Sequence, residues 1–122
     1  MNSVAILGAS NDRAKFGNKA VRAFLRAGYT VYPVNPRETL VEGLPAFNSI
    51  GEVPERPARI SVYLPSPVLL RLLPEIAARG CDELWLNPGT DSPAVVSEAA
   101  RLGLNVICAC SIIAVGARPS EL

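Results

Sequence analysis

Three segments of the chain repeat one pattern: an amphipathic stretch, a glycine, and a short run rich in apolar residues. They read AVRAFLRAG-YTVYPVN, LLPEIAARG-CDELWLN and AVVSEAARLG-LNVICAC, with Gly28, Gly80 and Gly103 at the junctions. A glycine at such a junction is typical of a helix C-terminus, where the chain turns back through a left-handed residue. Helices of this length alternating with strands predict a parallel sheet covered on both faces.

The repeat sets the expected positions of the strands and helices. The predicted strands are residues 4–8, 30–34, 60–64, 83–86 and 105–108, with a short additional strand near 46–47. The predicted helices are residues 18–27, a segment within 68–79, and 93–102. We therefore predict an α/β chain with a three-layer Rossmann-like fold. Its parallel sheet of about five strands is expected in the order 3-2-1-4-5, numbered along the chain.

Prolines refine the helix boundaries. Ser92 followed by Pro93 favours an N-cap with proline at the first helical position. Pro74 is expected to break a helix that runs from residue 68, so the second helix is predicted to start near it. The segment 36–59 is rich in proline, glycine and charge, and is predicted to replace a full helix with loop and at most one turn.

The composition agrees with one folded domain over residues 1–122. The chain is 49% hydrophobic, and its 12 basic and 11 acidic residues are mixed, without the basic block that a nucleic-acid partner requires. The apolar runs are too short for a membrane span, and no secretory signal is visible. Three cysteines without metal-type pairing favour a reducing compartment, so we expect a cytoplasmic protein with neither nucleic acid nor membrane as partner.

The chain contains no histidine. This excludes an imidazole general base, an imidazole metal ligand and a phosphohistidine. The carboxylates, Glu42 among them, show no pairing that predicts acid–base catalysis, and most are expected to be solvated turn residues. We therefore predict no catalytic residue and no metal site.

The first predicted strand leads into the loop GASNDRAKFG and then into a helix. At this place, free backbone N–H groups and the helix dipole favour an anion. Gly8 permits a sharp turn, Ser10 can donate from its hydroxyl, Lys15 brings a mobile positive charge, and Gly17 allows close approach of a bulky anion. The loop matches neither the dinucleotide fingerprint nor the P-loop. A phosphate site is one interpretation, and an ordinary strand–helix turn with a solvated lysine is the other.

The second predicted strand ends in Asn35, Pro36 and Arg37. An NAD-binding sheet usually has an acidic residue here that accepts hydrogen bonds from the ribose. Arg37 would instead favour a phosphate on the ribose, which both NADP and coenzyme A carry. The alternative is that Arg37 is a surface residue in a turn fixed by Pro36.

Five motifs then follow in order between about residues 4 and 106: GAS…KFG, VYPVNPR, EGLPAFNSI, VYLPSP and LWLNPGT. In this order and spacing they resemble the small stand-alone coenzyme A-binding proteins, relatives of the nucleotide-binding domain of succinate–CoA ligase alpha subunits. The resemblance implies a Rossmann-like fold that binds coenzyme A, with the diphosphate on the first loop and the ribose phosphate near Arg37. It implies a groove completed by the loops at Pro65 and Asn87.

The loops and the resemblance together predict a set of cofactor-binding residues. They are Gly8, Ala9, Ser10, Lys15, Phe16, Gly17, Asn35, Pro36, Arg37, Pro65, Ser66, Asn87, Pro88 and Gly89. Many members of the family have glutamine in place of Asn87 and a DRC-like ending where this chain has CACSIIAVG. The ligases pass a phosphoryl group through a histidine, so this chain alone cannot perform their reaction.

The predicted function is binding of coenzyme A or an acyl-CoA by a carrier, sensor or accessory module that is not a self-sufficient enzyme. Two alternatives stay open: a minimal NADP-dependent oxidoreductase, and a ligand-free module that binds another protein. The C-terminal segment SIIAVGARPSEL could cap the sheet or mediate a homodimer. Cys108 and Cys110 are expected on one strand face. Cys110 is either a buried small residue or a thiol able to exchange with that of coenzyme A.

Overall fold

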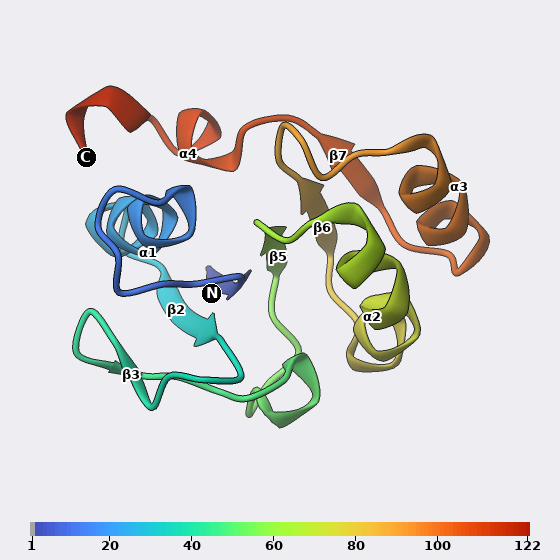
Figure 1. Cartoon of the computed structure of the whole chain (residues 1–122), viewed down its shortest axis with the longest axis horizontal. Coiled ribbons are helices and arrows are strands. Elements are labelled where there is room, and N and C mark those ends of the chain that lie inside the picture. Colours follow the sequence, from blue (N-terminus) through green and yellow to red (C-terminus); the bar gives the residue numbers. More distant parts are fainter. Residues whose placement is uncertain (1) are drawn as a thin grey trace.

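A computed structural model of the chain describes residues 2–122, in which helices and strands alternate (Figure 1). The elements are β1 (Ser3–Leu7), α1 (Phe16–Arg26), β2 (Thr30–Val34), β3 (Leu40–Val41), β4 (Leu44–Pro45), β5 (Arg59–Val62), α2 (Ser66–Arg79), β6 (Glu83–Leu86), α3 (Pro93–Arg101), β7 (Val106–Cys108) and α4 (Ser111–Ala114), with 3-10 turns η1 (Ile50–Glu52) and η2 (Pro119–Glu121). None of the helices in the described residues is long and apolar enough to cross a membrane.

Five parallel strands form the main sheet, and β3 and β4 make a separate antiparallel hairpin. The helices α1 and α4 cover one face of the sheet, and α2 and α3 cover the other (Figure 1). Successive residues of β1 point to opposite faces: Val4 and Ile6 pack with Phe24 of α1, whereas Leu7 packs with Leu73 of α2. The prediction of a three-layer Rossmann-like α/β fold is confirmed.

The predicted strand order is wrong. The sheet runs β2-β1-β5-β6-β7, which in the numbering of the five predicted strands is 2-1-3-4-5. The outer edge of β2 is occupied, because the Phe47 N–H donates to the Pro33 carbonyl and the Asn35 N–H donates to the Phe47 carbonyl, each at 2.9 Å. The next strand of the sheet, β5, therefore pairs with the free edge of β1. Pro33 carries the sequence signal for this order, since proline cannot donate a ladder hydrogen bond and favours edge strands.

The predicted start of the second helix is also wrong, because α2 runs unbroken from Ser66 to Arg79 through Pro74. Leu69, Leu73 and Ile76 of α2 are buried, whereas Pro74 is exposed. Pro74 lacks the N–H that would have bonded to the carbonyl of Leu70, four positions earlier, so α2 gives up one backbone hydrogen bond there. Tertiary packing of the apolar face thus holds a helix that local preference would interrupt.

The other helix ends follow the prediction. The Ser92 hydroxyl accepts a hydrogen bond from the Val95 N–H at 3.3 Å, as an N-cap does, and Pro93 is the first residue of α3. Gly28, Gly80 and Gly103 end the three helices with φ of 85°, 78° and 79°. The start of α3 and the glycines that follow the three helices therefore agree with local chemistry.

Candidate functional site

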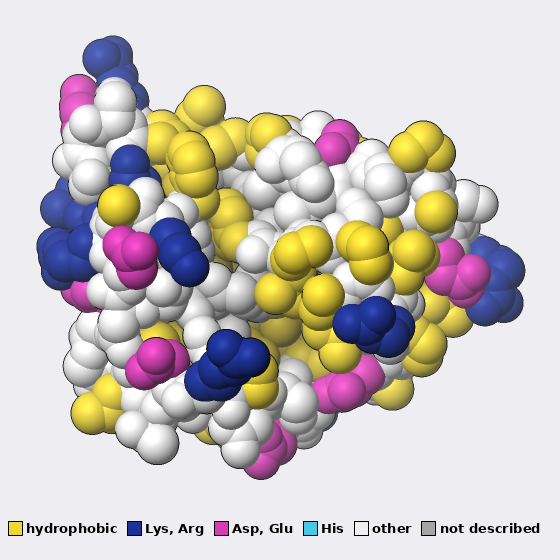
Figure 2. Space-filling model, in the orientation of Figure 1, with side chains coloured by type: hydrophobic (Ala, Val, Ile, Leu, Met, Phe, Trp, Pro, Cys, Tyr) yellow, Lys and Arg dark blue, Asp and Glu magenta, His cyan; other side chains and the backbone are white. Residues whose placement is uncertain are grey.

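The carboxyl ends of the central strands β1 and β5 carry a groove. The chain leaves β1 toward α1 on one face of the sheet and leaves β5 toward α2 on the other, and ligands of parallel sheets bind where the connections diverge in this way. Two hollows of about 310 Å³ and about 370 Å³ lie there and share Gly8 and Leu64 as lining residues. Figure 2 shows apolar side chains gathered over α2 and around the hollow beside it.

Two glycines let the backbone of the first loop pack tightly against its neighbours. Gly8 has φ of 87°, and a Cβ there would lie 2.4 Å from the carbonyl oxygen of Tyr63. A Cβ on Gly17 would lie 2.0 Å from the carbonyl oxygen of Gly8. The start of α1 therefore sits directly over the end of β1. At this helix start the Asn18 N–H donates to the Lys15 carbonyl at 3.1 Å. Among the described residues, no acceptor is bonded to the N–H groups of Phe16 and Gly17, which are available to a ligand.

The rest of the first loop is ordered by local hydrogen bonds. The Ser10 hydroxyl accepts from the Asp12 N–H at 3.0 Å, which leaves the hydroxyl hydrogen free to donate. Ala9 is buried, and its carbonyl accepts from the Asn35 side chain at 2.8 Å. Lys15 is exposed at the N-cap position of α1 and lines the larger hollow together with Phe16. The loop thus presents a cation and a helix N-terminus to the groove.

The hairpin of β3 and β4 holds this loop through Glu42. The Glu42 carboxylate accepts from the Asn18 side chain at 2.9 Å and from Arg13 at 2.7 Å, and its backbone N–H donates to Asn11 at 3.2 Å. The same Asn18 amide donates to the Ser10 carbonyl at 2.8 Å. The hydrogen bond from Asn18 and the charge of Arg13 lower the pKa of Glu42. The expectation of a solvated turn residue is therefore wrong for Glu42. It adopts a left-handed backbone with φ of 49° and connects the hairpin to the first loop by hydrogen bonds.

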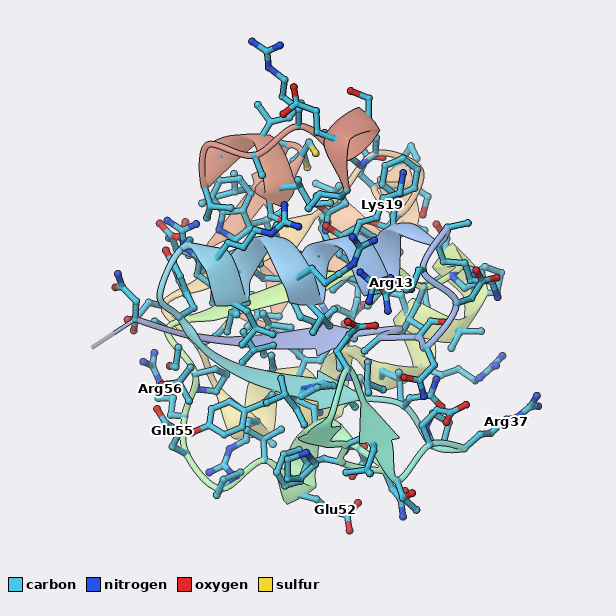
Figure 3. The ribbon with its side chains drawn as sticks, turned by 90° about the vertical axis from the view of Figure 1, so that its left-hand side faces the viewer. Arg13, Lys19, Arg37, Glu52, Glu55 and Arg56 are labelled. Carbon is cyan, nitrogen blue, oxygen red and sulfur yellow. The ribbon has the colours of Figure 1, made fainter. Side chains whose placement is uncertain are left out.

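In the turn after β2, Asn35 and Pro36 face the groove and Arg37 faces solvent. The Asn35 side chain accepts from the Arg37 N–H at 2.7 Å, and both Asn35 and Pro36 line the smaller hollow. The Arg37 side chain is exposed and extends away from the body of the molecule (Figure 3). Arg37, although predicted to bind the cofactor, lines neither hollow.

The loop after β6 places Asn87 inside the molecule. The Asn87 amide nitrogen donates to the Ser61 hydroxyl at 2.8 Å and to the Val62 carbonyl at 2.9 Å. Its oxygen accepts from the Ser111 N–H at 2.9 Å and from the Ser111 hydroxyl at 3.0 Å. Because these four bonds use the amide fully, Asn87 ties β5, β6 and α4 together, while the next residues Pro88 and Gly89 line the groove.

The loop after β5 contributes Pro65 to the wall of the larger hollow. Ser66 begins α2 and donates its hydroxyl to the Thr90 carbonyl at 3.5 Å, which links the loops after β5 and β6. Thr90 itself donates to the Asn87 carbonyl at 2.7 Å. These contacts connect the two loops that border the larger hollow.

Sequence reasoning missed most of the smaller hollow. Its lining is apolar, with Asn48 and Ser49 among the residues that border it and Val68 and Leu72 of α2 on one side. Val68 and Leu72 are four residues apart and therefore share a helix face. That spacing was the available signal, but it is equally typical of core packing. Whether Val68 and Leu72 face the end of β2 depends on the order of the strands, which the sequence analysis predicted wrongly.

The two cysteines near the chain end do not share a strand face. Cys108 ends β7 and is exposed, whereas Cys110 lies beyond the strand at the N-cap position of α4. The chain turns here because Asn87 holds Ser111. Cys110 is half-buried and faces a third hollow of about 150 Å³. The cysteine buried in the core is Cys81, whose pKa burial raises to about 11.

Part of the sequence is similar to two archaeal acetate–CoA ligases. The chain is 33% identical over 78 residues to the alpha subunit of acetate–CoA ligase (ADP-forming) II of Pyrococcus furiosus, which is 63% of this chain and 17% of that protein. It is 29% identical over 114 residues to acetate–CoA ligase (ADP-forming) I of Archaeoglobus fulgidus, 85% of this chain and 17% of that protein. The chain thus spans less than a fifth of the length of these relatives.

Solved structures of small proteins match over nearly their whole length. A conserved hypothetical protein of Pyrococcus furiosus superposes with a TM-score of 0.86 at 29% identity, covering 93% of this chain and 99% of that one. A Thermus thermophilus protein superposes with a TM-score of 0.85 at 28% identity, covering 92% of this chain and 86% of that one. The family described as CoA binding domain matches residues 2–116. The resemblance seen in the sequence is confirmed, and the chain belongs to the CoA binding domain family.

Proposed function

We propose that this chain binds coenzyme A or an acyl-CoA in the groove across the ends of β1 and β5, and that it acts as a binding module. The observation that carries the proposal is an apolar hollow beside the end of β2 that opens onto a glycine-lined helix N-terminus. Membership of a CoA-binding family supports the same ligand. A nucleotide needs both an apolar slot for its base and a site for its phosphates.

The groove suggests an order for the parts of the ligand. In Rossmann-like folds the adenosine lies near the end of the second strand, so the adenine belongs in the hollow between Pro36 and Val68. The diphosphate then meets the N–H groups at the start of α1, with Lys15 beside them. Arg37 lies on the rim of the adenosine end, where it can reach a phosphate on the ribose. The pantetheine continues over Pro88 toward β6.

A role without catalysis is supported by the side chains along the groove. In the part of the chain that the structure describes, the titratable ones that line its hollows are Lys15, Tyr63 and Cys110. The structure pairs none of these with a carboxylate, and the Tyr63 hydroxyl bonds to the Ser111 hydroxyl at 3.1 Å. Burial raises the pKa of Tyr63, which keeps it protonated. An activated base or nucleophile normally has a titratable partner.

Thermal unfolding with coenzyme A, dephospho-CoA, NADP and NAD, each across a concentration series, tests the proposal. A ligand at a hundred times its dissociation constant stabilises by about 2.7 kcal/mol, which for a chain of this size is a shift of roughly 10 °C. We expect the largest shift with coenzyme A and a smaller one with dephospho-CoA. A flat response to coenzyme A would refute the proposal, and a larger shift with NADP would favour the oxidoreductase alternative.

Two variants separate the phosphate sites. Lys15→Ala should weaken coenzyme A and dephospho-CoA alike, because Lys15 is assigned to the diphosphate that both carry. Arg37→Ala should weaken coenzyme A alone and remove its advantage over dephospho-CoA. Arg26→Ala is the matched control, since Arg26 is an exposed arginine at the opposite end of α1. If Arg37→Ala and Arg26→Ala behave identically, the assignment of Arg37 is wrong.

A further inference from the structure

The groove has an extension whose chemistry differs from the rest. A hollow of about 150 Å³ is lined by Phe16, Tyr63, Asn87, Pro88 and Cys110. Three of these residues, Phe16, Tyr63 and Pro88, also line the larger hollow of the groove. The two hollows are therefore adjacent, with these three side chains bordering both. The extension lies toward β6 and α4, on the far side of the α1 N-terminus from the adenosine end.

The walls of this extension offer almost no polar contact. The side-chain amide of Asn87 is fully used by Ser61, Val62 and Ser111. The Tyr63 hydroxyl is bonded to the Ser111 hydroxyl. The surface that remains consists of two aromatic rings, the Pro88 ring and the sulfur of a cysteine. Such walls favour an apolar group and disfavour a charged one, which would lose its hydration without gaining a partner.

The size of the hollow limits its occupant. A cavity of about 150 Å³ with apolar walls accommodates a molecule the size of benzene. The corresponding acyl chain has about two to six carbon atoms. If the adenosine lies beside the end of β2 and the diphosphate lies at the start of α1, the sulfur at the end of the pantetheine lies next to this hollow.

We propose that the hollow beside Cys110 receives the acyl group of an acyl-CoA with a short, uncharged chain. This rests on the proposed function and adds a substrate class to it. Phe16 and Tyr63 provide the walls that contact the chain, and Cys110 closes the end. The acyl group stacks between these side chains, and its thioester lies at the passage beside Pro88.

Isothermal titration calorimetry with coenzyme A, acetyl-CoA, butyryl-CoA and succinyl-CoA tests the inference. Each buried methylene strengthens binding by about fourfold, so butyryl-CoA, with two methylenes more, is expected to bind roughly fifteenfold tighter than acetyl-CoA, and acetyl-CoA tighter than coenzyme A. Succinyl-CoA has an acyl chain of the same length but ends in a carboxylate, and it should bind no tighter than coenzyme A. Equal affinity for butyryl-CoA and coenzyme A would overturn the inference and leave the proposed function standing. If no CoA compound binds, both fail.

A variant locates the acyl group. Cys110→Phe should fill the hollow and abolish the advantage of butyryl-CoA over coenzyme A. Cys108→Phe is the matched control, because Cys108 is exposed and lines none of the hollows described. An unchanged butyryl-CoA advantage in Cys110→Phe would overturn the inference. If Cys110→Phe fails to fold, Cys110→Leu, which is smaller, gives the same test, and the comparison of ligands on the unaltered chain stands by itself.

Discussion

The buried amide of Asn87 carries the sharpest prediction of this structure. Asn87 is 2% exposed and makes four side-chain hydrogen bonds to β5 and α4. Asn87→Ala removes all four. The hydroxyls of Ser61 and Ser111 can still bond to each other, since they lie 2.7 Å apart. The Val62 carbonyl loses its side-chain donor and the Ser111 N–H loses its acceptor, both inside the molecule.

These two orphaned backbone groups set the magnitude. Each buried unsatisfied group costs about 1–3 kcal/mol, so Asn87→Ala should lower the free energy of unfolding by about 4 kcal/mol. For a chain of this size that corresponds to a fall in Tm of roughly 15 °C. Urea unfolding followed by tryptophan fluorescence measures it directly. The single tryptophan, Trp85, is 8% exposed and lies two residues before Asn87.

Two further variants make the measurement specific. Asn105→Ala is the matched control, because Asn105 is exposed and makes one side-chain hydrogen bond, to the Asp82 carbonyl at 3.1 Å. It should cost under about 1 kcal/mol. Asn87→Asp keeps the shape but turns an oxygen toward the Val62 carbonyl, so its loss of stability should be smaller at low pH, where the acid can donate. If Asn87→Ala unfolds within about 1 kcal/mol of the unaltered chain, the reasoning on buried hydrogen bonds is refuted.

Two other predictions concern the first loop. Gly17→Ala places a Cβ 2.0 Å from the Gly8 carbonyl oxygen, so it should cost about 3 kcal/mol. Gly28→Ala is the control, because a Cβ there meets no atom within 4 Å and only the φ of 85° is unfavourable. It should lower the free energy of unfolding by about 1–2 kcal/mol. Equal losses of stability in the two variants would contradict the close packing of Gly17 against Gly8. The hydrogen bond from Asn18, and to a smaller extent the charge of Arg13, hold the pKa of Glu42 in the folded state below its ordinary value of 4.5. The Glu42 carboxylate therefore stabilises the fold above that value and loses this contribution as the pH falls through the folded pKa. Glu42→Gln should be less stable than the unaltered chain near neutral pH, with a difference that shrinks in acid; a difference independent of pH would exclude this role.

Much of the groove was predictable because its residues follow strand ends. Gly8, Lys15 and Gly17 lie where the loop pattern placed them, and Asn35 and Pro36 line the predicted side. The side chain of Arg37 lies outside the groove. Ala9 is buried and its carbonyl is bonded to Asn35, and Ser66 links two loops. The assignment of these residues to coenzyme A stays a prediction.

The strand order and the course of α2 show where local reasoning ends. Pro33 indicates an edge strand, but the decision depends on Phe47 pairing with β2. Pro74 argues for a break in the helix, but burial of Leu69 and Leu73 outweighs it. In both cases a contact made by residues far apart in the sequence, or by a whole helix face, overrides a local preference.

The amino-acid sequence by itself determined the alternation of helices and strands, the positions of the turns and the glycine loop. These features depend on periodicity and on the conformational freedom of single residues. Only the tertiary structure decided that Asn87 faces inward, that Glu42 clasps the loop and that Phe16, Tyr63 and Cys110 enclose one hollow. Their partners lie on other elements, and which elements become neighbours is settled by the strand order and by packing of the whole core.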